Sequence, residues 1–146
     1  MFVLVALLLS ALPASLIAIE RDRLETIVGQ SKGKSPAAAA AADDSKAIAK
    51  LIDDINAAVR ADKRKMLSII TINTDVAGTT LEQQRLRTGL TFGDLYVAHS
   101  LALATRKKFD HFVAFKAGGQ SWAQIARAHK VSLKGRAELL KEMMKQ

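Results

Sequence analysis

The sequence predicts an all-α protein, a compact bundle of about six or seven short helices that follows an apolar N-terminal leader. Strand signals are scarce, because the chain has little β-branched alternation and no Asn-Gly or Asp-Gly hairpin dipeptide. Apolar residues instead recur every three or four positions, as they do on one face of a helix. Helix-capping patterns occur between these apolar segments and divide the chain into short helices.

Composition divides the chain into three segments. Residues 1–19 form the leader, which carries no charged side chain and is followed by Glu20. A run of this length is typical of a signal peptide or a membrane anchor. Residues 20–42 are rich in small and polar residues that offer little to bury, so we expect a flexible low-complexity linker. Residues 43–146 are expected to form one basic helical domain, long enough for a single core.

The leader predicts that the protein is exported, so we expect a periplasmic or secreted location. If the leader is not cleaved, residues 2–19 would contact the membrane and anchor the domain at the inner membrane. The chain contains no cysteine. Export to an oxidising compartment would therefore leave no disulfide as a trace.

The first helix of the domain is predicted by an apolar stripe. Asp43, Asp44 and Ser45 can each cap its start, and the polar residues 61–65 end or bend it. The stripe follows helical spacing at Ile48, Leu51, Ile52, Ile55 and Val59.

Later helices are predicted from their ends. A helix is expected over residues 66–73, Gly89 is expected to end the next one, and Gly118-Gly119 to end an aromatic helix over residues 109–115. Ser132 is expected to cap the last helix. Three capping-box patterns mark further helix starts: Thr79-x-x-Glu82, Thr91-x-x-Asp94 and Ser121-x-x-Gln124.

The charge distribution predicts an anionic partner. The net charge is +8, and residues 105–146 hold ten Lys or Arg side chains against three Asp or Glu. No aromatic residues alternate with these cations, so attraction to phosphate-type groups is expected rather than base stacking. Four cations that cluster around one turn are the predicted anion-binding residues: Arg127, Lys130, Lys134 and Arg136.

The sequence predicts no catalytic residue, no metal site and no cofactor. The only histidines are His99, His111 and His129, and no two of them form a His-Glu-x-x-His pair. Gly118-Gly119 lacks the following Gly-Lys-Ser or Gly-Lys-Thr of a phosphate-binding loop. We therefore expect a non-enzymatic protein.

The segment from Ser121 to Ser132 resembles the first helix and turn of a helix-turn-helix unit. Residues 66–83 repeat its outline, with Ile70 and Val76 in the places of Ile125 and Val131. Lys130, however, stands where such a turn usually has glycine. The resemblance implies corners of this kind in the bundle, and DNA binding as an alternative function.

A second local resemblance is to the LysM glycan-binding module. Gly119 to Ala126 is similar to the start of its helix, which would put Gly119, Ser121 and Trp122 near a sugar groove. The resemblance implies peptidoglycan binding as a further alternative. The LysM fold also needs a β-strand on each side of the helix, and nothing strand-like follows Leu133.

The longest resemblance covers residues 66–132 and is to an uncharacterised family of small exported bacterial helical proteins. Its motifs are Gly89-Leu90-x-Phe92-Gly93 and Gly119-x-x-Trp122-x-x-Ile125-Ala126. The resemblance implies export and a helical fold, without an activity. The motifs are typical of helix termini and core anchors, so Trp122 is expected in the core or as an aromatic at its rim.

These observations predict a non-enzymatic, exported helical binding module. The expected partner is an anionic polymer, a lipid head group or a protein at the cell envelope, and nucleic acid is less favoured.

Overall fold

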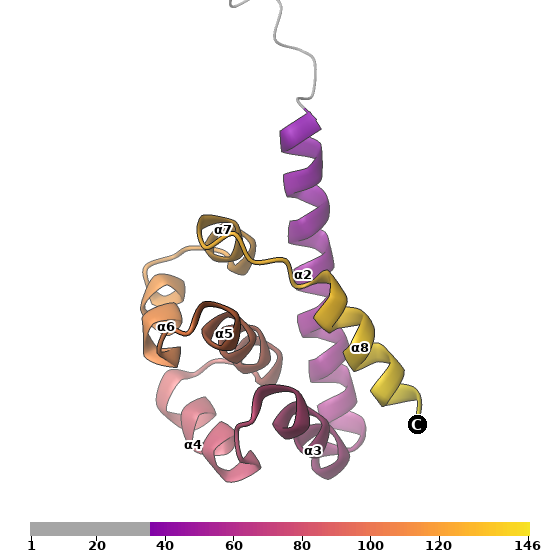
Figure 1. Ribbon diagram of the computed structural model, residues 1–146. Helices are drawn as coiled ribbons and strands as arrows, with labels where there is room; N and C mark the ends of the chain where they lie inside the picture. Colours follow the sequence, from indigo (N-terminus) through magenta and orange to yellow (C-terminus); the bar gives the residue numbers. More distant parts are fainter. Residues whose placement is uncertain (1–35) are drawn as a thin grey trace, which may run out of the picture. The chain divides into compact units, whose positions relative to one another are not determined.

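The computed structural model describes residues 36–146, which form seven helices and no strand (Figure 1). The predicted all-α class is confirmed. The predicted leader and residues 20–35 of the predicted linker lie outside the described residues. Within residues 36–146, no helix combines the length and apolarity needed to cross a membrane. The helices are α2 (Pro36–Ala61), α3 (Lys63–Thr74), α4 (Gly78–Thr88), α5 (Phe92–Thr105), α6 (Phe109–Ala117), α7 (Trp122–Ala128) and α8 (Lys134–Lys145).

Helix α2 begins earlier than predicted and has 26 residues. It includes residues 36–42, which composition placed in the linker. Alanine has the highest helix propensity and proline is favoured at the first helical position, so this segment belongs to the helix itself. Asp43, Asp44 and Ser45 therefore lie inside α2, and the prediction that they cap its start is wrong.

Two of the three predicted capping boxes form. The side chains of Thr91 and Ser121 accept hydrogen bonds from the backbone N–H groups of Asp94 and Gln124, whose own side chains accept from the two N-cap residues. Gly89 ends α4 with a φ of 71°, a left-handed conformation that glycine adopts without strain. These caps set where α5 and α7 begin.

Two predicted helix starts are wrong. Helix α4 begins at Gly78 after Ala77, so Thr79 lies within its first turn and does not cap it. Helix α8 begins after Leu133 rather than after Ser132, and no side chain caps it. Leu133 is 4% exposed, so the burial of an apolar side chain, rather than a capping hydroxyl, fixes the start of α8.

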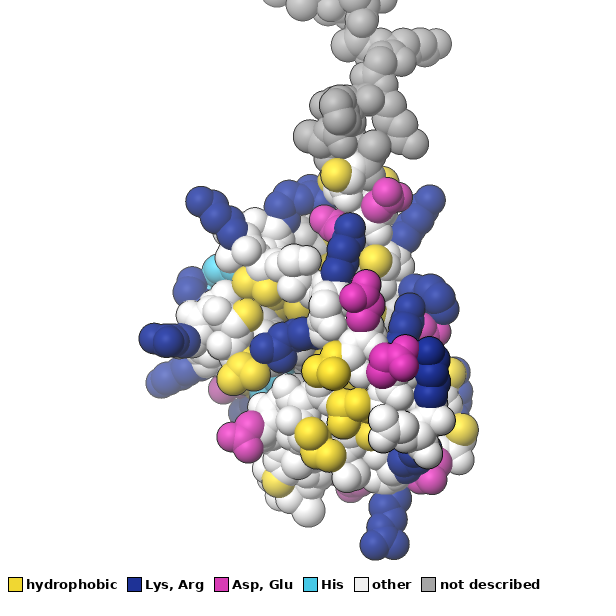
Figure 2. All heavy atoms as spheres, turned by 45° about the vertical axis from the view of Figure 1, so that its right-hand side comes forward, with side chains coloured by type: hydrophobic (Ala, Val, Ile, Leu, Met, Phe, Trp, Pro, Cys, Tyr) yellow, Lys and Arg dark blue, Asp and Glu magenta, His cyan; other side chains and the backbone are white. Residues whose placement is uncertain are grey.

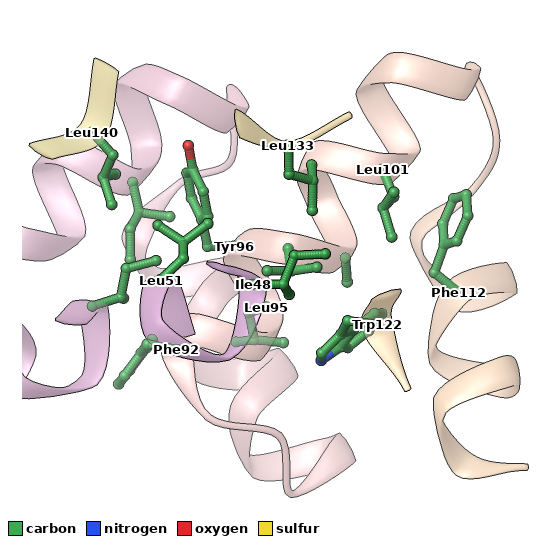
Figure 3. Packing of buried hydrophobic residues seen from close by; sticks show 14 of the residues in the cluster. Ile48, Leu51, Phe92, Leu95, Tyr96, Leu101, Phe112, Trp122, Leu133 and Leu140 are labelled. Atoms are coloured by element: carbon green, nitrogen blue, oxygen red, sulfur yellow. The ribbon is translucent and has the colours of Figure 1, made fainter. Parts of the chain in front are cut away.

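Helix α5 lies at the centre of the bundle, with α2, α3, α4 and α6 around it (Figure 1). Its buried residues face every direction, which is typical of a helix enclosed on all sides. Side chains from α2, α7 and α8 point into the same interior (Figure 3). Core residues from these three helices are Ile48, Leu51, Ile55, Trp122, Ile125 and Leu140.

Helices α2 and α5 touch at Gly93. A Cβ atom on Gly93 would lie 2.6 Å from the carbonyl oxygen of Ile52 and 2.8 Å from its Cα, so only glycine fits there. Beside this contact, the Asn56 side chain accepts from the Gly93 N–H at 3.0 Å and donates to the Thr91 hydroxyl at 3.1 Å. The start of α5 is thus bound to the middle of α2.

The same helix start is bound to α7. Asp94 Oδ1 accepts from the indole N–H of Trp122 at 2.7 Å, while Oδ2 accepts from the Thr91 hydroxyl at 2.6 Å. A buried indole needs such a partner for its N–H. Asn56, Thr91, Asp94 and Trp122 therefore form one polar network, here called the α5 hub, which joins α2, α5 and α7.

Helix α8 is held by contacts to α5 and α3. The Tyr96 hydroxyl donates to the backbone oxygen of Arg136 at 3.4 Å, and burial raises the pKa of Tyr96. Arg136 Nη1 in turn donates to the backbone oxygen of Asn73 at 3.5 Å. Asn73 Nδ2 lies 3.1 Å from the sulfur of Met143. These contacts fix the orientation of α8.

The α3–α4 and α7–α8 corners share an unusual backbone conformation. Asp75 and Lys130 are both left-handed, with φ values of 58° and 56°. Each is followed by a valine packed against the core, Val76 or Val131. These positions correspond in the repeat that the sequence suggested, but Arg106 after α5 has the same conformation, with a φ of 56°, so the left-handed turn is not specific to the repeat.

Candidate functional site

The candidate site is a pocket of about 360 Å³ between α2, α7, the following turn and α8. Its volume lies within the range of small-molecule sites. Eight of its lining residues are apolar, and five are polar or charged. They are Asp44, Ala47, Ile48, Leu51, Ala123, Ala126, Arg127, Lys130, Val131, Ser132, Leu133, Lys134 and Ala137.

The lining is apolar inside and basic at its edge. Ile48, Leu51 and Leu133 are buried, whereas Arg127, Lys130 and Lys134 are exposed. We call the three exposed cations the basic rim. A ligand in the pocket would therefore meet hydrocarbon at one end and positive charge at the other.

The turn after α7 brings the rim cations together. The Lys130 N–H donates to the Arg127 oxygen at 3.0 Å, and the Val131 N–H donates to the Ala126 oxygen at 2.9 Å. This bonding reverses the chain around Lys130 and sends it into α8. Consequently Lys134 lies on the same pocket as Arg127, although seven positions separate them.

Two polar contacts join α7 and α8 to α2. Arg127 donates to the backbone oxygen of Ala41 at 3.3 Å, and Lys134 lies 3.6 Å from the carboxylate of Asp44. Asp44 is the only carboxylate among the described residues that line the pocket. Positive charge is thus in excess among the lining residues. Figure 2 shows Lys and Arg side chains, with acidic ones among them, around the end of the domain where α2 begins.

Three of the four predicted anion-binding residues meet at this pocket, and Arg136 does not. Arg136 instead faces α3 through its contact with Asn73. The sequence grouped Arg136 with the other three because it lies only two residues after Lys134. On a helix, however, residues two positions apart point to nearly opposite sides. Arg136 therefore helps to hold α8 against α3.

Trp122 lies in the core, which is one of the two positions that the sequence predicted for it. It is 3% exposed, and the ammonium group of Lys116 lies 5.6 Å from its ring centroid. A side chain so enclosed offers no surface on which a sugar or a base could stack. The flanking strands that a LysM module requires do not occur within residues 36–146.

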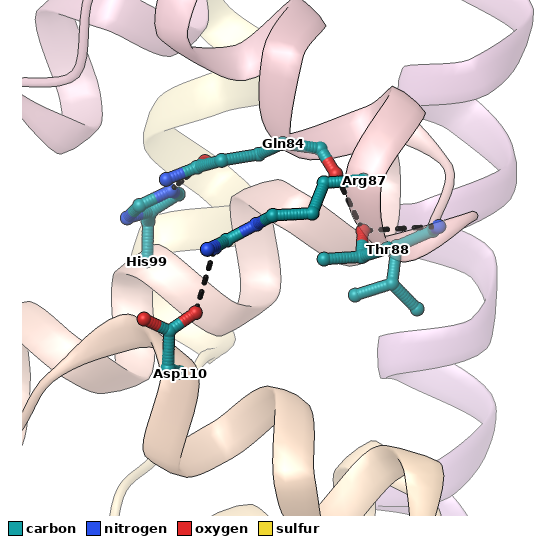
Figure 4. A network of polar contacts seen from close by, with 6 residues as sticks. Gln84, Arg87, Thr88, His99 and Asp110 are labelled. Atoms are coloured by element: carbon teal, nitrogen blue, oxygen red, sulfur yellow. Dashed lines mark hydrogen bonds and ion pairs between the residues drawn. The ribbon is translucent and has the colours of Figure 1, made fainter.

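A second polar cluster joins α4, α5 and α6 on another part of the domain (Figure 4). His99 Nε2 lies 2.6 Å from Gln84 Oε1, and its ring stacks on Phe109 with a centroid distance of 4.3 Å. Burial lowers the pKa of His99 to about 4, and the Asp110 carboxylate opposes that shift. Asp110 also pairs with Arg87 at 2.7 Å. Because His99 is only 8% exposed, this cluster serves packing.

The described residues offer no grouping of side chains typical of a metal centre. Within residues 36–146, no three His, Asp or Glu side chains come together as ligands. A Gly-x-Ser-x-Gly spacing, the pattern of a nucleophile elbow, occurs at residues 29–33 and lies outside the described residues.

Comparisons of the chain with protein-family models, with curated proteins and with solved structures found no match. The resemblance of residues 66–132 to small exported bacterial helical proteins thus stays a prediction. The function of the chain is therefore inferred from the geometry and charge of the pocket.

We expect His99 to make the protein less stable in acid. Its pKa is about 4 in the folded chain and near 6.5 when exposed. Between these values the unfolded chain binds a proton that the folded chain does not, so the free energy of unfolding falls as the pH falls. The loss between about pH 7 and about pH 4.5 should be about 2 kcal/mol. Urea unfolding at both pH values measures it.

His99→Gln removes this titration and should reduce the loss by that amount. Gln84→Glu should also reduce it, because a carboxylate beside the ring stabilises the imidazolium. An equal loss of stability in all three proteins would show that His99 does not cause it.

Proposed function

We propose that this chain is a non-enzymatic binding module that holds an anionic ligand in the pocket between α2, α7 and α8. The observation that supports the proposal most directly is the convergence of Arg127, Lys130 and Lys134, with one carboxylate, on a pocket of about 360 Å³. Three cations against one anion leave an excess of positive charge where a ligand would bind. This excess favours an anion over a neutral or cationic ligand.

The contacts already made by the rim are weak enough to be replaced. The side chains of Lys134 and Asp44 are 65% and 51% exposed, and they lie 3.6 Å apart. Exposed ion pairs of this kind contribute about 0–1 kcal/mol to stability. An incoming anion can therefore replace Asp44 as the partner of Lys134 at little cost in stability. Lys130, which lines the same pocket, makes no ion pair among the described residues.

We further propose that the module works outside the cytosol, at the cell envelope or after secretion. The uncharged run from Phe2 to Ile19 supports this location. The partners that fit both the location and the pocket are anionic envelope components, such as a lipid head group or an acidic polymer.

DNA binding is the alternative that follows from the resemblance of residues 121–132 to a helix-turn-helix unit. The outward side of α8, however, carries Glu138 and Glu142 as well as cations, and Leu139 is 55% exposed there. A helix that enters the major groove beside phosphates is expected to avoid carboxylates on that side. The pocket is therefore the better supported site.

Removal of the rim charges should weaken anion binding. In the variant Arg127→Gln, Lys130→Gln, Lys134→Gln, we expect affinity for alkyl phosphates to fall at least about tenfold, since each lost charge contact weakens binding. Isothermal titration calorimetry of the full chain measures the affinity.

The matched control is Arg64→Gln, Lys107→Gln, Lys108→Gln, which removes the same charge at exposed positions outside the pocket. Its affinity should equal that of the unaltered chain. An equal loss in the rim and control variants would mean that only the net charge matters, and would contradict the proposal.

The location has a separate test. Two reporter enzymes are fused in turn after Gln146 and expressed in a bacterial host. The reporter that works only in the periplasm should be active, and the reporter that works only in the cytoplasm should be inactive. Deletion of residues 2–19 should reverse the result. A fusion that is active only as the cytoplasmic type contradicts export and leaves the pocket proposal to its own test.

A further inference from the structure

We propose that the ligand is a single-chain amphiphile, with an anionic head group on the basic rim and an alkyl chain in the apolar part of the pocket. This inference rests on the proposed anion-binding function and specifies its ligand. It follows from the apolar part of the pocket, which the binding of a small anion alone would not use.

A small anion alone would leave most of the pocket unused. The rim cations are exposed at the pocket's edge, whereas Ile48, Leu51, Ala123 and Leu133 are between 2% and 8% exposed. Apolar surface of this kind gains nothing from contact with phosphate. These side chains expose little surface of their own, so the binding free energy would come mainly from the hydrocarbon of the ligand as it leaves water.

The lining also favours a slender chain. Ala47, Ala123, Ala126 and Ala137 supply half of the eight apolar side chains of the lining. Alanine leaves space close to the helix backbones, and no aromatic side chain lines the pocket on which a flat ring would stack. An alkyl chain needs only aliphatic contacts, which Ile48, Leu51 and Leu133 provide.

The charges lie where a head group would need them. Arg127 and Lys134 already reach across to α2, where they contact the Ala41 oxygen and Asp44. A phosphate or carboxylate head group would replace Asp44 as the anion beside Lys134, with Lys130 and Arg127 on the same pocket. Asp44 therefore acts as an internal competitor, and Asp44→Asn is expected to tighten binding.

The test is a titration of the full chain with alkyl phosphates of increasing length, kept as monomers, and with inorganic phosphate as the head group alone. Each buried methylene should tighten binding about threefold to fourfold, until the chain fills the pocket. Longer chains should then bind no more tightly. Asp44→Asn should raise the affinity across the series by a similar factor at each length.

A pair of alanine substitutions locates the chain. Ala47 is exposed and lines the pocket, whereas Ala49 is exposed on α2 and does not line it. Ala47→Leu should shorten the longest chain that still gains affinity, and Ala49→Leu should not. Because both variants keep residues 1–35, any binding of alkyl chains there cancels in the comparison.

The outcomes separate the two proposals. If inorganic phosphate binds as tightly as octyl phosphate, and the rim variant loses both, the anion site stands and the amphiphile inference is wrong. If neither ligand binds, both proposals are wrong. Binding to anionic phospholipid vesicles without binding to monomeric alkyl phosphates would also overturn the inference, because it would assign the rim to a membrane surface instead of a single enclosed chain.

Discussion

The contact between the backbones of α2 and α5 at Gly93 is the constraint on which the rest of the structure depends. It brings two helices closer than any side chain at position 93 would allow, since a Cβ there would lie 2.6 Å from a backbone oxygen. Asn56 satisfies the polar groups beside the contact, and Asp94 extends the same network to the indole of Trp122. One helix start thereby sets the positions of α2 and α7.

The pocket is a consequence of that arrangement. Helix α2 supplies one wall, α7 and its turn supply the second, and α8 supplies the third. The α5 hub positions the first two, and the contacts of Tyr96 and Arg136 position α8. The rim cations themselves are exposed and contribute little to folding. Their placement at the mouth of an apolar hollow is consistent with a binding role, since the fold does not need them there.

The sequence predicted the helical class and two of the helix caps, but not the caps of α2, α4 and α8 or the long-range contacts. The capping boxes of α5 and α7 were predictable because each depends on residues three positions apart. The burial of α5 on every side depends on the helices packed around it, which no pattern within residues 92–105 specifies. Three of the four predicted anion-binding residues line one pocket, because they lie close together in sequence. The contribution of α2 to the pocket was not predictable, because Arg127 contacts a backbone oxygen 86 residues away.

Substitution of Gly93 tests the central claim most directly. Gly93→Ala should lower the free energy of unfolding by about 1–3 kcal/mol or more, because α2 and α5 must separate, and should weaken ligand binding by displacing the α2 wall. Gly135→Ala, where an added Cβ meets nothing within 4 Å, should leave stability unchanged or raise it by up to about 1 kcal/mol. Thermal and urea unfolding of the two variants give the comparison. If Gly93→Ala is as stable as the unaltered chain, the close contact between α2 and α5 is contradicted. The claim that this contact positions the α2 wall of the pocket would then be wrong as well.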